Sequence, residues 1–444
     1  MKTIILDESK ITGTDSIQKI INSCAEETFL ELIIKSGRYQ IEPLILRSNM
    51  KLHLEKGCIL KLTDNFSFYP PIYTRWEGID CYAMRSGIFA ENCSNIIISG
   101  SGIIDGQGQK WWKAYREIKN NKNSETLAEI RTQLLDLNKN ITTASGGGGR
   151  ETGFLRPSLI QIKNCEKVII ENIGLQNSPF WNTHILYSSK VDIKNVRFNN
   201  PANAPNTDGL DIDSSKDVNI EGCFFSVGDD CLCLKSGMET DKASVCGNVK
   251  IKNCTMKNGH GAVVFGSETS GGIENIDIEN CFFNGTDRGI RLKTRRGRGG
   301  FIKNIHIKNI EMNSVISPIV VNMNYSCGAK PEELSFLSDT KPRPINKTTP
   351  VIENITIEDI AALNVTSSVG FFSGLPESPI KNIVVNNLEV EFNSKSPLNN
   401  PAMDFFNTKA ESPAIILSNI ENYNITNIEI KNYTGSIVKN ESNR

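Results

Sequence analysis

The sequence predicts an all-β protein, a single right-handed parallel β-helix in which each coil of short strands stacks on the coil before it. Two observations carry this prediction. Runs of the type Asn-Ile-x-Ile recur at intervals of 23 to 31 residues between Val168 and Ile305, which is the period of a solenoid. Each run alternates apolar with polar residues, as strands do, and a turn-forming residue follows most runs at a fixed distance.

The N-terminal segment 1–28 is predicted to cap the solenoid. Thr14, Asp15 and Ser16 favour the start of a helix, and in the next stretch, IQKIINSC, the apolar residues lie on one helical face. Alternation with a period of two begins only at Leu30. We therefore expect this short helix to precede all the strands.

The coils are counted from the first apolar residue of each run, which we call its anchor. The anchors are Ile96, Val168, Val191, Val218, Val249, Ile276, Ile305, Ile355, Ile383 and Ile428. The fourth residue after the anchor is Asn172, Asn195, Gly222, Asn253, Asn280, Asn309, Asp359, Asn387 or Asn432. Asn, Gly and Asp enter the left-handed backbone region at the lowest cost, so the same turn is predicted in these coils.

The residue after this turn is predicted to point into the core. Ile and Val dominate the position, and Cys223, Cys254 and Cys281 take their place in three coils. Cysteine that exchanges with aliphatic residues acts as a small hydrophobe. With no second cysteine pair at zinc spacing beside Cys231 and Cys233, we expect free thiols, no metal site and no cofactor.

Three long intervals between anchors predict insertions that leave a single domain spanning residues 1–444. The expected insertions are 107–158, 322–350 and 393–422. The first contains WWKAYREIKNNKNSETLAEIRTQLLDL, which has helical character, and then Gly146 to Gly149 followed by Arg150. Loops of solenoids tend to emerge on the functional face.

Charge and hydropathy narrow the function classes. With 49 basic and 50 acidic residues the formal charge is −1, which gives no global field to attract nucleic acid or an anionic membrane. No apolar run approaches the roughly 20 residues that cross a bilayer. The start MKTIILDESK is too short in apolar residues for a secretory signal, so a cytoplasmic protein is expected, or a secreted one if a signal has been removed. The oligomeric state is not predicted.

Six chemically active residues fall at similar phase on four consecutive coils. They are Asp208, Asp229, Asp230, His260, Arg291 and Lys293. Asp in a loop is usually a solvated turn residue, but the shared phase predicts three carboxylates, an imidazole and two cations on one wall. Such acids bind a cation or prepare a group for proton transfer. Asp211 and Asp213 are interpreted instead as strand residues that support the site.

The motifs around these residues resemble the family-28 glycoside hydrolases, or polygalacturonases. The four are Asn206-Thr207-Asp208, Gly228-Asp229-Asp230, Gly259-His260-Gly261 and Arg291-Leu292-Lys293, where the family usually has Arg-Ile-Lys. Each is weak alone, but four in the family's order on a β-helix repeat are specific. The similarity extends to SPFWNTHI at 178–185 and IIDGQGQKWW at 103–112.

The resemblance implies hydrolysis of α-1,4-linked galacturonic acid with inversion, and an acidic, galacturonate-containing oligosaccharide or polysaccharide as partner. It implies Asp229 as general acid, Asp208 and Asp230 as activators of the water, and His260 as an aid to the acid. Arg291 and Lys293 would bind the uronic carboxylate. One conflict stays open: acids on neighbouring coils lie about 5 Å apart, a spacing typical of retaining enzymes.

Further residues are predicted to bind substrate. The stretch RGIRLKTRRGRGG at 288–300 is basic, and Arg296 within it is expected to grip an acidic chain, since no interleaved aromatic residues suggest nucleic acid. Tyr325 follows the cationic pair by one coil, and His184 lies in the shared stretch beside Trp181. With the long first insertion, this patch leads us to expect exo-action at a cleft closed at one end.

Other readings remain open from the sequence. A β-helix polysaccharide lyase would use calcium and give an unsaturated product. Another pectic glycosidase would act on rhamnogalacturonan or xylogalacturonan. From a different class, a non-catalytic β-helix would bind carbohydrate through the cations and aromatic residues without needing the acids.

Overall fold

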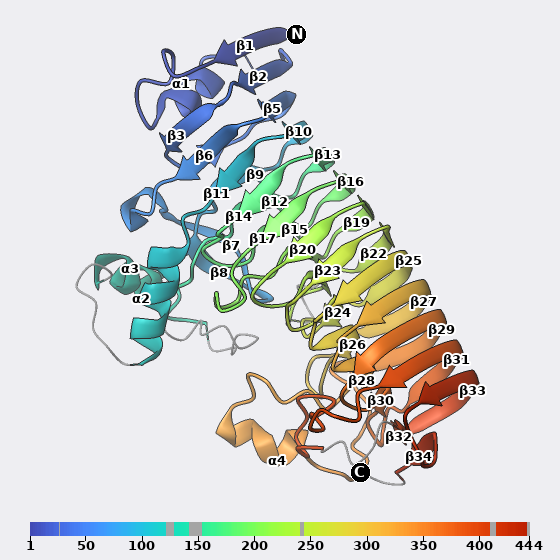
Figure 1. The fold of residues 1–444 in the computed structure, drawn as a ribbon. Helices are drawn as coiled ribbons and strands as arrows, with labels where there is room; N and C mark the ends of the chain where they lie inside the picture. The colour runs from blue at the N-terminus through green and yellow to red at the C-terminus, as the bar shows by residue number, and fades with distance from the viewer. Residues whose placement is uncertain (26, 121–127, 142–152, 240–243, 409–413, 442–444) are drawn as a thin grey trace. The chain divides into compact units, whose positions relative to one another are not determined.

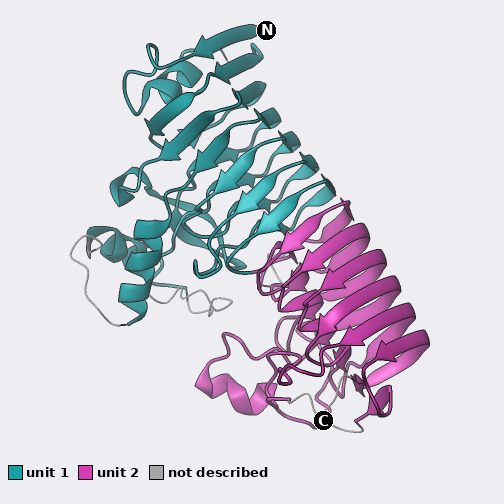
Figure 2. Ribbon diagram, viewed as in Figure 1, with its two compact units in different colours: residues 1–229 teal, residues 230–444 magenta. Residues whose placement is uncertain are grey.

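The computed structural model describes residues 1–444 except 26, 121–127, 142–152, 240–243, 409–413 and 442–444. The chain divides into two compact units, residues 1–229 and 230–444 (Figure 2). Each unit is a stack of parallel strands, so the predicted all-β, parallel β-helix fold is confirmed (Figure 1). That the two units form one domain stays a prediction.

Unit 1 holds three rows of parallel strands. The first row is β1 (Lys2–Leu6), β2 (Leu30–Ile34), β5 (Met50–Leu54), β10 (Ser94–Gly100), β13 (Glu166–Glu171), β16 (Ser189–Lys194) and β19 (Lys216–Glu221). The second is β3 (Gly37–Ile41), β6 (Cys58–Leu62), β11 (Ile103–Asp105), β14 (Gly174–Gln176), β17 (Arg197–Asn199) and β20 (Phe224–Ser226). The third is β4 (Leu44–Ile45), β9 (Ile88–Glu91), β12 (Ile160–Lys163), β15 (Thr183–Leu186) and β18 (Leu210–Asp213).

Unit 2 continues the same architecture with longer strands. One row is β22 (Cys246–Lys252), β25 (Ile273–Asn284), β27 (Phe301–Asn313), β29 (Val351–Val365), β31 (Ile380–Phe392) and β33 (Ile420–Lys431), with β23 (Thr255–Lys257) also on β25. The other is β21 (Leu232–Lys235), β24 (Val263–Gly266), β26 (Arg288–Lys293), β28 (Ser317–Asn322), β30 (Gly370–Ser373), β32 (Ile415–Ser418) and β34 (Val438–Asn440).

The strand register confirms the anchors within each unit, with one exception. Ile96 pairs with Val168, and the pairing continues through Val191 to Val218. In unit 2 it runs from Val249 to Ile383. Ile383, however, pairs with Tyr423, and Ile428 pairs with Leu388. The anchor Ile428 was wrong because β33 contains the Asn-Ile-x-Ile pattern one turn later than the other coils.

The predicted turn residues all adopt the left-handed conformation. Asn172, Asn195 and the seven others have φ between 53° and 64°. Their side chains also bond along the stack: the Nδ2 of Asn195 donates to the Oδ1 of Asn172 at 3.1 Å. The residue just before most anchors is left-handed as well, a second turn per coil that the sequence reasoning missed.

Alternate residues of the strands form the core. The anchors other than Ile428 are buried, and so are Cys223, Cys254 and Cys281, at 1 to 3% exposure. All twelve cysteines lie in the described part of the chain and are free thiols, as predicted. Cysteine therefore adds to the core as an apolar side chain, at about 25 cal/mol per Å² of apolar surface buried.

The N-terminal cap contains the predicted helix and also a strand that was not predicted. Helix α1 (Ser16–Asn22) buries Ile17 and Ile21. It does not precede all the strands, however, because β1 comes first and pairs with β2. The run Lys2–Leu6 was missed because only Leu6 is buried, which weakens its alternation.

Insertions interrupt both units. Between β11 and β12 lie α2 (Gln109–Lys119) and α3 (Ala128–Leu137), within the predicted range 107–158; Gly146 to Arg150 fall outside the described residues. Between β28 and β29 lie η4 (Pro331–Glu333) and α4 (Leu334–Leu337), as the range 322–350 predicts. The range 393–422 was too long, since β32 and the start of β33 are regular strands.

One further excursion of unit 1 was not predicted. After η1 (Phe66–Phe68), strands β7 (Pro71–Trp76) and β8 (Ile79–Met84) form an antiparallel hairpin. Its Trp76 joins an apolar cluster with Trp111, Trp112 and Phe180. Among the described residues, none of the helices combines the length and the apolar character that crossing a bilayer requires.

Candidate active site

In unit 1 the turn that carries Asp208 is held tightly by backbone and side-chain contacts. Asn206 has φ 54°, a left-handed conformation that Asn tolerates, and the Thr207 hydroxyl donates to the Ala204 carbonyl at 2.9 Å. The backbone N–H of Asn182 donates to the carbonyl of Asp208 at 2.8 Å. Asp208, 4% exposed, stands two residues before β18. A carboxylate on so constrained a turn has little freedom to move.

Gly228 explains why the second motif begins with glycine. A Cβ built on Gly228 would lie 2.3 Å from the Ala204 carbonyl oxygen and 2.7 Å from the Thr207 hydroxyl. Any larger residue would displace the turn that carries Asp208. Asp229 follows and is half-buried, so its side chain can be reached from solvent.

Arg156 lies behind the Asp208 turn and was not singled out from the sequence. Its guanidinium is fully buried and donates to the carbonyl oxygens of Pro179 and Pro205 at 2.8 and 2.9 Å. It also donates to the Oδ1 of Asn206 at 2.7 Å. A lone arginine near the end of an insertion carries no distinct sequence signal. Only the fold shows what it contacts.

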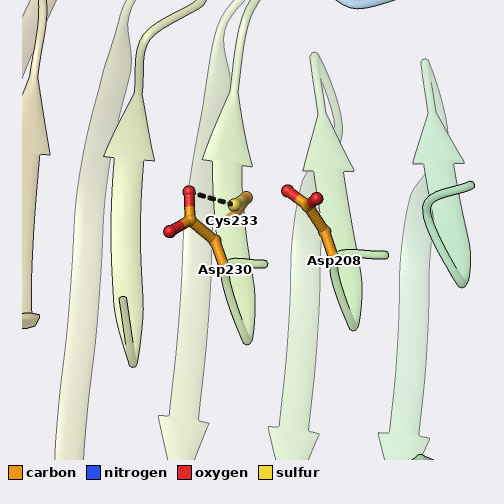
Figure 3. A group of neighbouring side chains, drawn as sticks. All are labelled: Asp208, Asp230 and Cys233. Atoms are coloured by element: carbon orange, nitrogen blue, oxygen red, sulfur yellow. Dashed lines mark hydrogen bonds between the residues drawn. The ribbon is translucent and has the colours of Figure 1, made fainter. Parts of the chain in front are cut away.

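In unit 2 the carboxylate of Asp230 is clamped by two cations. Arg291 Nη1 lies 3.1 Å from Oδ1, and Lys293 Nζ lies 2.7 Å from Oδ2. The thiol of Cys233 is 3.7 Å from Oδ2, an interaction drawn in Figure 3. Asp230 stands two residues before β21, as Asp208, also labelled in Figure 3, does before β18. The structure thus brings together three of the predicted residues and adds Cys233.

The electrostatics of this clamp favour the ionised acid. Burial alone would raise the pKa of Asp230, but Lys293 and Arg291 outweigh burial and hold it well below its usual range, with a smaller contribution from His260. In turn, burial would lower the pKa of Lys293, and Asp230 keeps it above its ordinary value. Both cations were predicted to bind the substrate carboxylate. In the structure both form ion pairs with Asp230.

Two further predicted residues, Tyr325 and His260, act on the clamp. Tyr325, 6% exposed, has its ring centroid 5.4 Å from Lys293 Nζ and 5.7 Å from the Arg291 guanidinium carbon. Burial raises the pKa of Tyr325 to about 12, so the phenol stays protonated. His260 is exposed in the loop between β23 and β24. Next to it, a Cβ on Gly261 would lie 3.0 Å from Asp230 Oδ1, which explains that glycine.

Residues of the third insertion also reach the clamp and were missed from the sequence. Arg291 Nη2 lies 3.8 Å from Met403 Sδ, and Arg288 donates to the carbonyls of Asn400 and Pro401. Met403 is 48% exposed. A methionine in a loop gives no sequence signal for a site, so this neighbour could be found only from the fold.

His184 was predicted to bind substrate, and its surroundings argue against that role. The ring is 1% exposed, packs edge-on against Trp181, and lies 3.0 Å from the Gln161 amide through Nδ1. Its Nε2 is 3.5 Å from the Oδ2 of Asp213. A ring enclosed on these sides cannot contact a sugar. We therefore correct the assignment to a buried network in which Asp213, as expected, is a supporting residue.

Arg296 was also predicted to bind substrate, and this too is corrected. Its guanidinium forms a two-point ion pair with Glu377, with N···O distances of 2.6 and 2.8 Å, and both side chains are 2 to 3% exposed. It also donates to the backbone carbonyls of Phe336, Asp339 and Lys341. Arg295 and Arg298 are buried as well, so the stretch 288–300 is not an exposed basic patch.

We expect the Arg296→Gln substitution to destabilise unit 2 by about 3 kcal/mol, because it leaves the buried carboxylate of Glu377 without its partner. The KM for substrate should not change. Thermal denaturation and steady-state kinetics measure the two effects. Arg343→Gln is the control. Its ion pair with Asp339 lies in the insertion whose backbone carbonyls Arg296 contacts, but this pair is more exposed and contributes about 1 kcal/mol or less. A raised KM with unchanged stability would restore the substrate-binding assignment.

The fold and these residues together define a class. A parallel β-helix offers a long wall of stacked strands on which a polymer can lie. Its motif turns carry carboxylates in different environments: Asp230 ionised between cations, and Asp229 partly open to solvent. Two acids in different states are what the hydrolysis of a glycosidic bond requires. The class is a carbohydrate-hydrolysing β-helix enzyme.

Comparison with known proteins gives the family. The model of the glycosyl hydrolases family 28 matches residues 135–402, and the chain belongs to this family as a glycoside hydrolase. A probable polygalacturonase of Vitis vinifera is 29% identical over 376 residues, covering 82% of this chain and 68% of the relative. An endo-polygalacturonase of Pectobacterium carotovorum subsp. carotovorum is 28% identical over 344 residues, covering 72% of this chain and 74% of the relative.

Among solved structures, a hyperthermoactive exopolygalacturonase from Thermotoga maritima has the same fold. The TM-score is 0.77 at 24% identity, and the match covers 97% of this chain and 91% of that one. The likeness supports the right-handed parallel β-helix architecture.

Proposed function

We propose that this protein hydrolyses α-1,4-galacturonosidic bonds of oligo- or polygalacturonate, by an inverting mechanism and from the chain end. The relatives named as polygalacturonases support the substrate class. The observation that carries the proposal is the carboxylate of Asp230 held between Arg291 and Lys293. It is a carboxylate of a family motif whose ionised form is favoured by two ion pairs.

The roles of the acids follow from their environments. Lys293 and Arg291 hold the pKa of Asp230 below its ordinary value, so the ionised form is favoured and Asp230 takes the role of base rather than of acid. Asp229, which faces a more open environment, takes the role of general acid to the leaving oxygen. Asp208 shares the activation of water with Asp230, a role supported by its equivalent place before β18. His260, exposed in the loop between β23 and β24, takes the role of an aid to the acid.

The cations take on a second role when substrate binds. Arg291 and Lys293 together carry more donors than the Asp230 carboxylate accepts in the structure. The two cations also carry one more positive charge than the Asp230 carboxylate neutralises, which favours binding of the carboxylate of a galacturonate residue. Tyr325 beside them supplies a flat surface and a protonated hydroxyl. This makes the site selective for uronic acids over neutral sugars.

The exo mode is the finer part of the proposal. It is supported by the first insertion, in which Tyr115 of α2 packs on Arg156, directly behind the Asp208 turn. Extra chain beside a catalytic turn restricts how far a polymer can extend past it. A cytoplasmic location and the lack of nucleic-acid or membrane partners stay predictions, as the comparisons do not bear on them.

Incubation with polygalacturonate and with a panel of defined pectic oligosaccharides tests the proposal. We expect monomer as the first product and a slow fall in viscosity relative to the reducing sugar released. Proton NMR should detect the β-anomer first, because inversion at an α-linkage gives β. An initial α-anomer contradicts inversion, and a rapid loss of viscosity with little reducing sugar contradicts exo-action.

The same assay separates the rival functions. Activity should survive a calcium chelator and produce no ultraviolet-absorbing unsaturated sugar, whereas a lyase would require the ion and form that product. Cleavage of only rhamnogalacturonan or xylogalacturonan would assign another pectic glycosidase. Binding of galacturonate without turnover of any substrate would indicate a carbohydrate-binding β-helix.

A further inference from the structure

Arg156 is unusual because its charge is buried without an acidic partner. The side chain has 0% exposure, and among the described residues no carboxylate lies within ion-pair distance of it. Its hydrogen-bond partners are two backbone carbonyls and one side-chain amide. A buried charge is costly unless it is paired. The burial of this arginine among mostly apolar side chains therefore indicates a role other than stabilising the fold.

Two aromatic rings fix the orientation of the guanidinium. Its central carbon lies 4.1 Å from the ring centroid of Tyr115 on α2 and 5.2 Å from that of Phe180. The two rings thus cover the flat faces of the guanidinium, and its N–H groups are directed at carbonyl oxygens. The Trp76 indole donates to the Arg156 carbonyl at 3.0 Å and fixes the backbone. The arginine is held in one position from several sides.

The guanidinium edge connects two segments that flank Asp208. One contact is to Pro179, in the segment whose Asn182 N–H donates to the Asp208 carbonyl. The other contacts are to Pro205 and Asn206, which directly precede Thr207 and Asp208. Arg156 therefore ties together both chain segments that determine where the Asp208 carboxylate lies.

We infer that Arg156 is a positioning residue for the reaction: it holds the Pro205–Asn206 turn so that Asp208 is presented to the substrate in a single orientation. The inference rests on the proposed function, in which Asp208 helps to activate water. It also gives the first insertion a part in the reaction, because Tyr115 of α2 holds the arginine from behind.

The charge of Arg156 adds an electrostatic effect. The charged and titratable groups that act on it are Tyr115 and Arg116 of α2, Glu77 in the β7–β8 turn, and Asp208. Burial lowers the pKa of Arg156 to about 10, so it remains a cation in the working range. A cation behind Asp208 favours the ionised carboxylate. Removing it should raise the pH above which Asp208 acts as a base.

The test compares Arg156→Gln and Arg156→Lys with the wild type on a galacturonate oligomer. For Arg156→Gln we expect kcat to fall by about 10- to 100-fold, since a small misplacement of a catalytic group costs about that much. The KM should stay within about threefold, and the acid limb of the kcat/KM profile should move to higher pH. Lysine restores the charge but not the multiple contacts, so Arg156→Lys should recover the acid limb and only part of kcat.

Arg116→Gln is the matched control. Arg116 lies on the same helix as Tyr115 and donates to the Asn203 carbonyl, but it is exposed, so solvent screens its charge. We expect kcat within about twofold of the wild type. If Arg156→Gln does not fold, Asn206→Gly removes one of the contacts and keeps the left-handed backbone without strain. It should lower kcat in the same direction at unchanged KM.

The outcomes separate the inference from the proposed function. Wild-type enzyme that cleaves no galacturonoside contradicts the proposed function and the inference with it. Active wild type overturns the inference alone if Arg156→Gln, or Asn206→Gly in its place, keeps kcat within threefold. The inference is also overturned if kcat falls only as much as the fraction of folded protein, measured by circular dichroism, and the acid limb of the pH profile does not move.

Discussion

Replacement of Asp230 by Asn is expected to lower kcat by about 10²- to 10⁴-fold, the usual contribution of a positioned acid or base. The amide cannot accept the proton of the attacking water, although its size is unchanged. The substitution also leaves Arg291 and Lys293 without the carboxylate that now neutralises them at 3.1 and 2.7 Å. Binding of an anionic substrate should therefore be retained or tightened, and KM should not rise.

Steady-state kinetics on a galacturonate oligomer, with circular dichroism as a check of folding, measure this effect. Asp277→Asn is the control, because Asp277 is an exposed carboxylate on β25 of the same unit. It should alter kcat by less than a factor of two. A kcat of Asp230→Asn within tenfold of the wild type would falsify the assignment of Asp230 as a base. Loss of substrate binding together with turnover would instead indicate that the ion pairs mainly preserve the shape of the cation site.

A large loss of stability is expected in unit 1 from Asp213→Asn. Asp213 is fully buried, 3.1 Å from Arg75 Nη1 and 3.5 Å from His184 Nε2, and it accepts a hydrogen bond from Ser214. Breaking a buried pair from one side costs about 3 to 5 kcal/mol. Arg75 keeps its contact with Asp80 at 2.9 Å, so we expect about 3 kcal/mol. The ring of Tyr187 lies 4.7 Å from the Arg75 guanidinium, so both side chains should become less ordered.

Denaturant unfolding followed by tryptophan fluorescence measures this loss in unit 1 specifically. The four tryptophans, Trp76, Trp111, Trp112 and Trp181, all lie in that unit. Asp192→Asn is the control: Asp192 is a half-exposed carboxylate on β16 whose contacts with Lys194 and Asn219 lie at the surface, so the change should cost about 0.5 kcal/mol or less. A midpoint of Asp213→Asn equal to that of the control would mean that the pair contributes nothing to stability.

The pH dependence of the Asp213 effect follows from the direction of its pKa. Burial would raise the pKa of this carboxyl, but Arg75 and His184 hold it below its usual range. A depressed folded-state pKa contributes stability that is fully present above the unfolded pKa of about 4 and is lost as the pH falls below it. The stability difference between wild type and Asp213→Asn should therefore be constant near neutrality and shrink in acid.

Much of the fold could be predicted because a β-helix repeats one short residue pattern from coil to coil. The side chain of Val191 or Ile276 has only two faces to choose from, and alternation decides between them. Asn195 and Asn280 mark turns because few other residues enter the left-handed region cheaply. The same repetition produced the error at Ile428, since a long strand such as β33 contains the pattern twice over and only pairing decides the register.

Less of the site could be predicted, and the failures have a common cause. Arg296 and His184 have the side chains of substrate-binding residues, but long or polar groups take whichever partner the fold brings near, here Glu377 and Asp213. Arg156 has no motif around it and gains its place only from Tyr115 and Asn206. These contacts join residues 29 to 112 positions apart in the chain, and some come from insertions outside the repeat, so a local pattern does not encode them.

The sequence by itself determined the class of fold, the family motifs and the residue types of the chemistry: Asp208, Asp229, Asp230, His260, Arg291 and Lys293. The tertiary structure decided how they are used. Arg291 and Lys293 could have faced only the substrate, but their long side chains reach the Asp230 carboxylate and keep it ionised. The reason is physical: backbone period fixes which face a residue occupies, while burial and the nearest opposite charge fix its protonation and its partner.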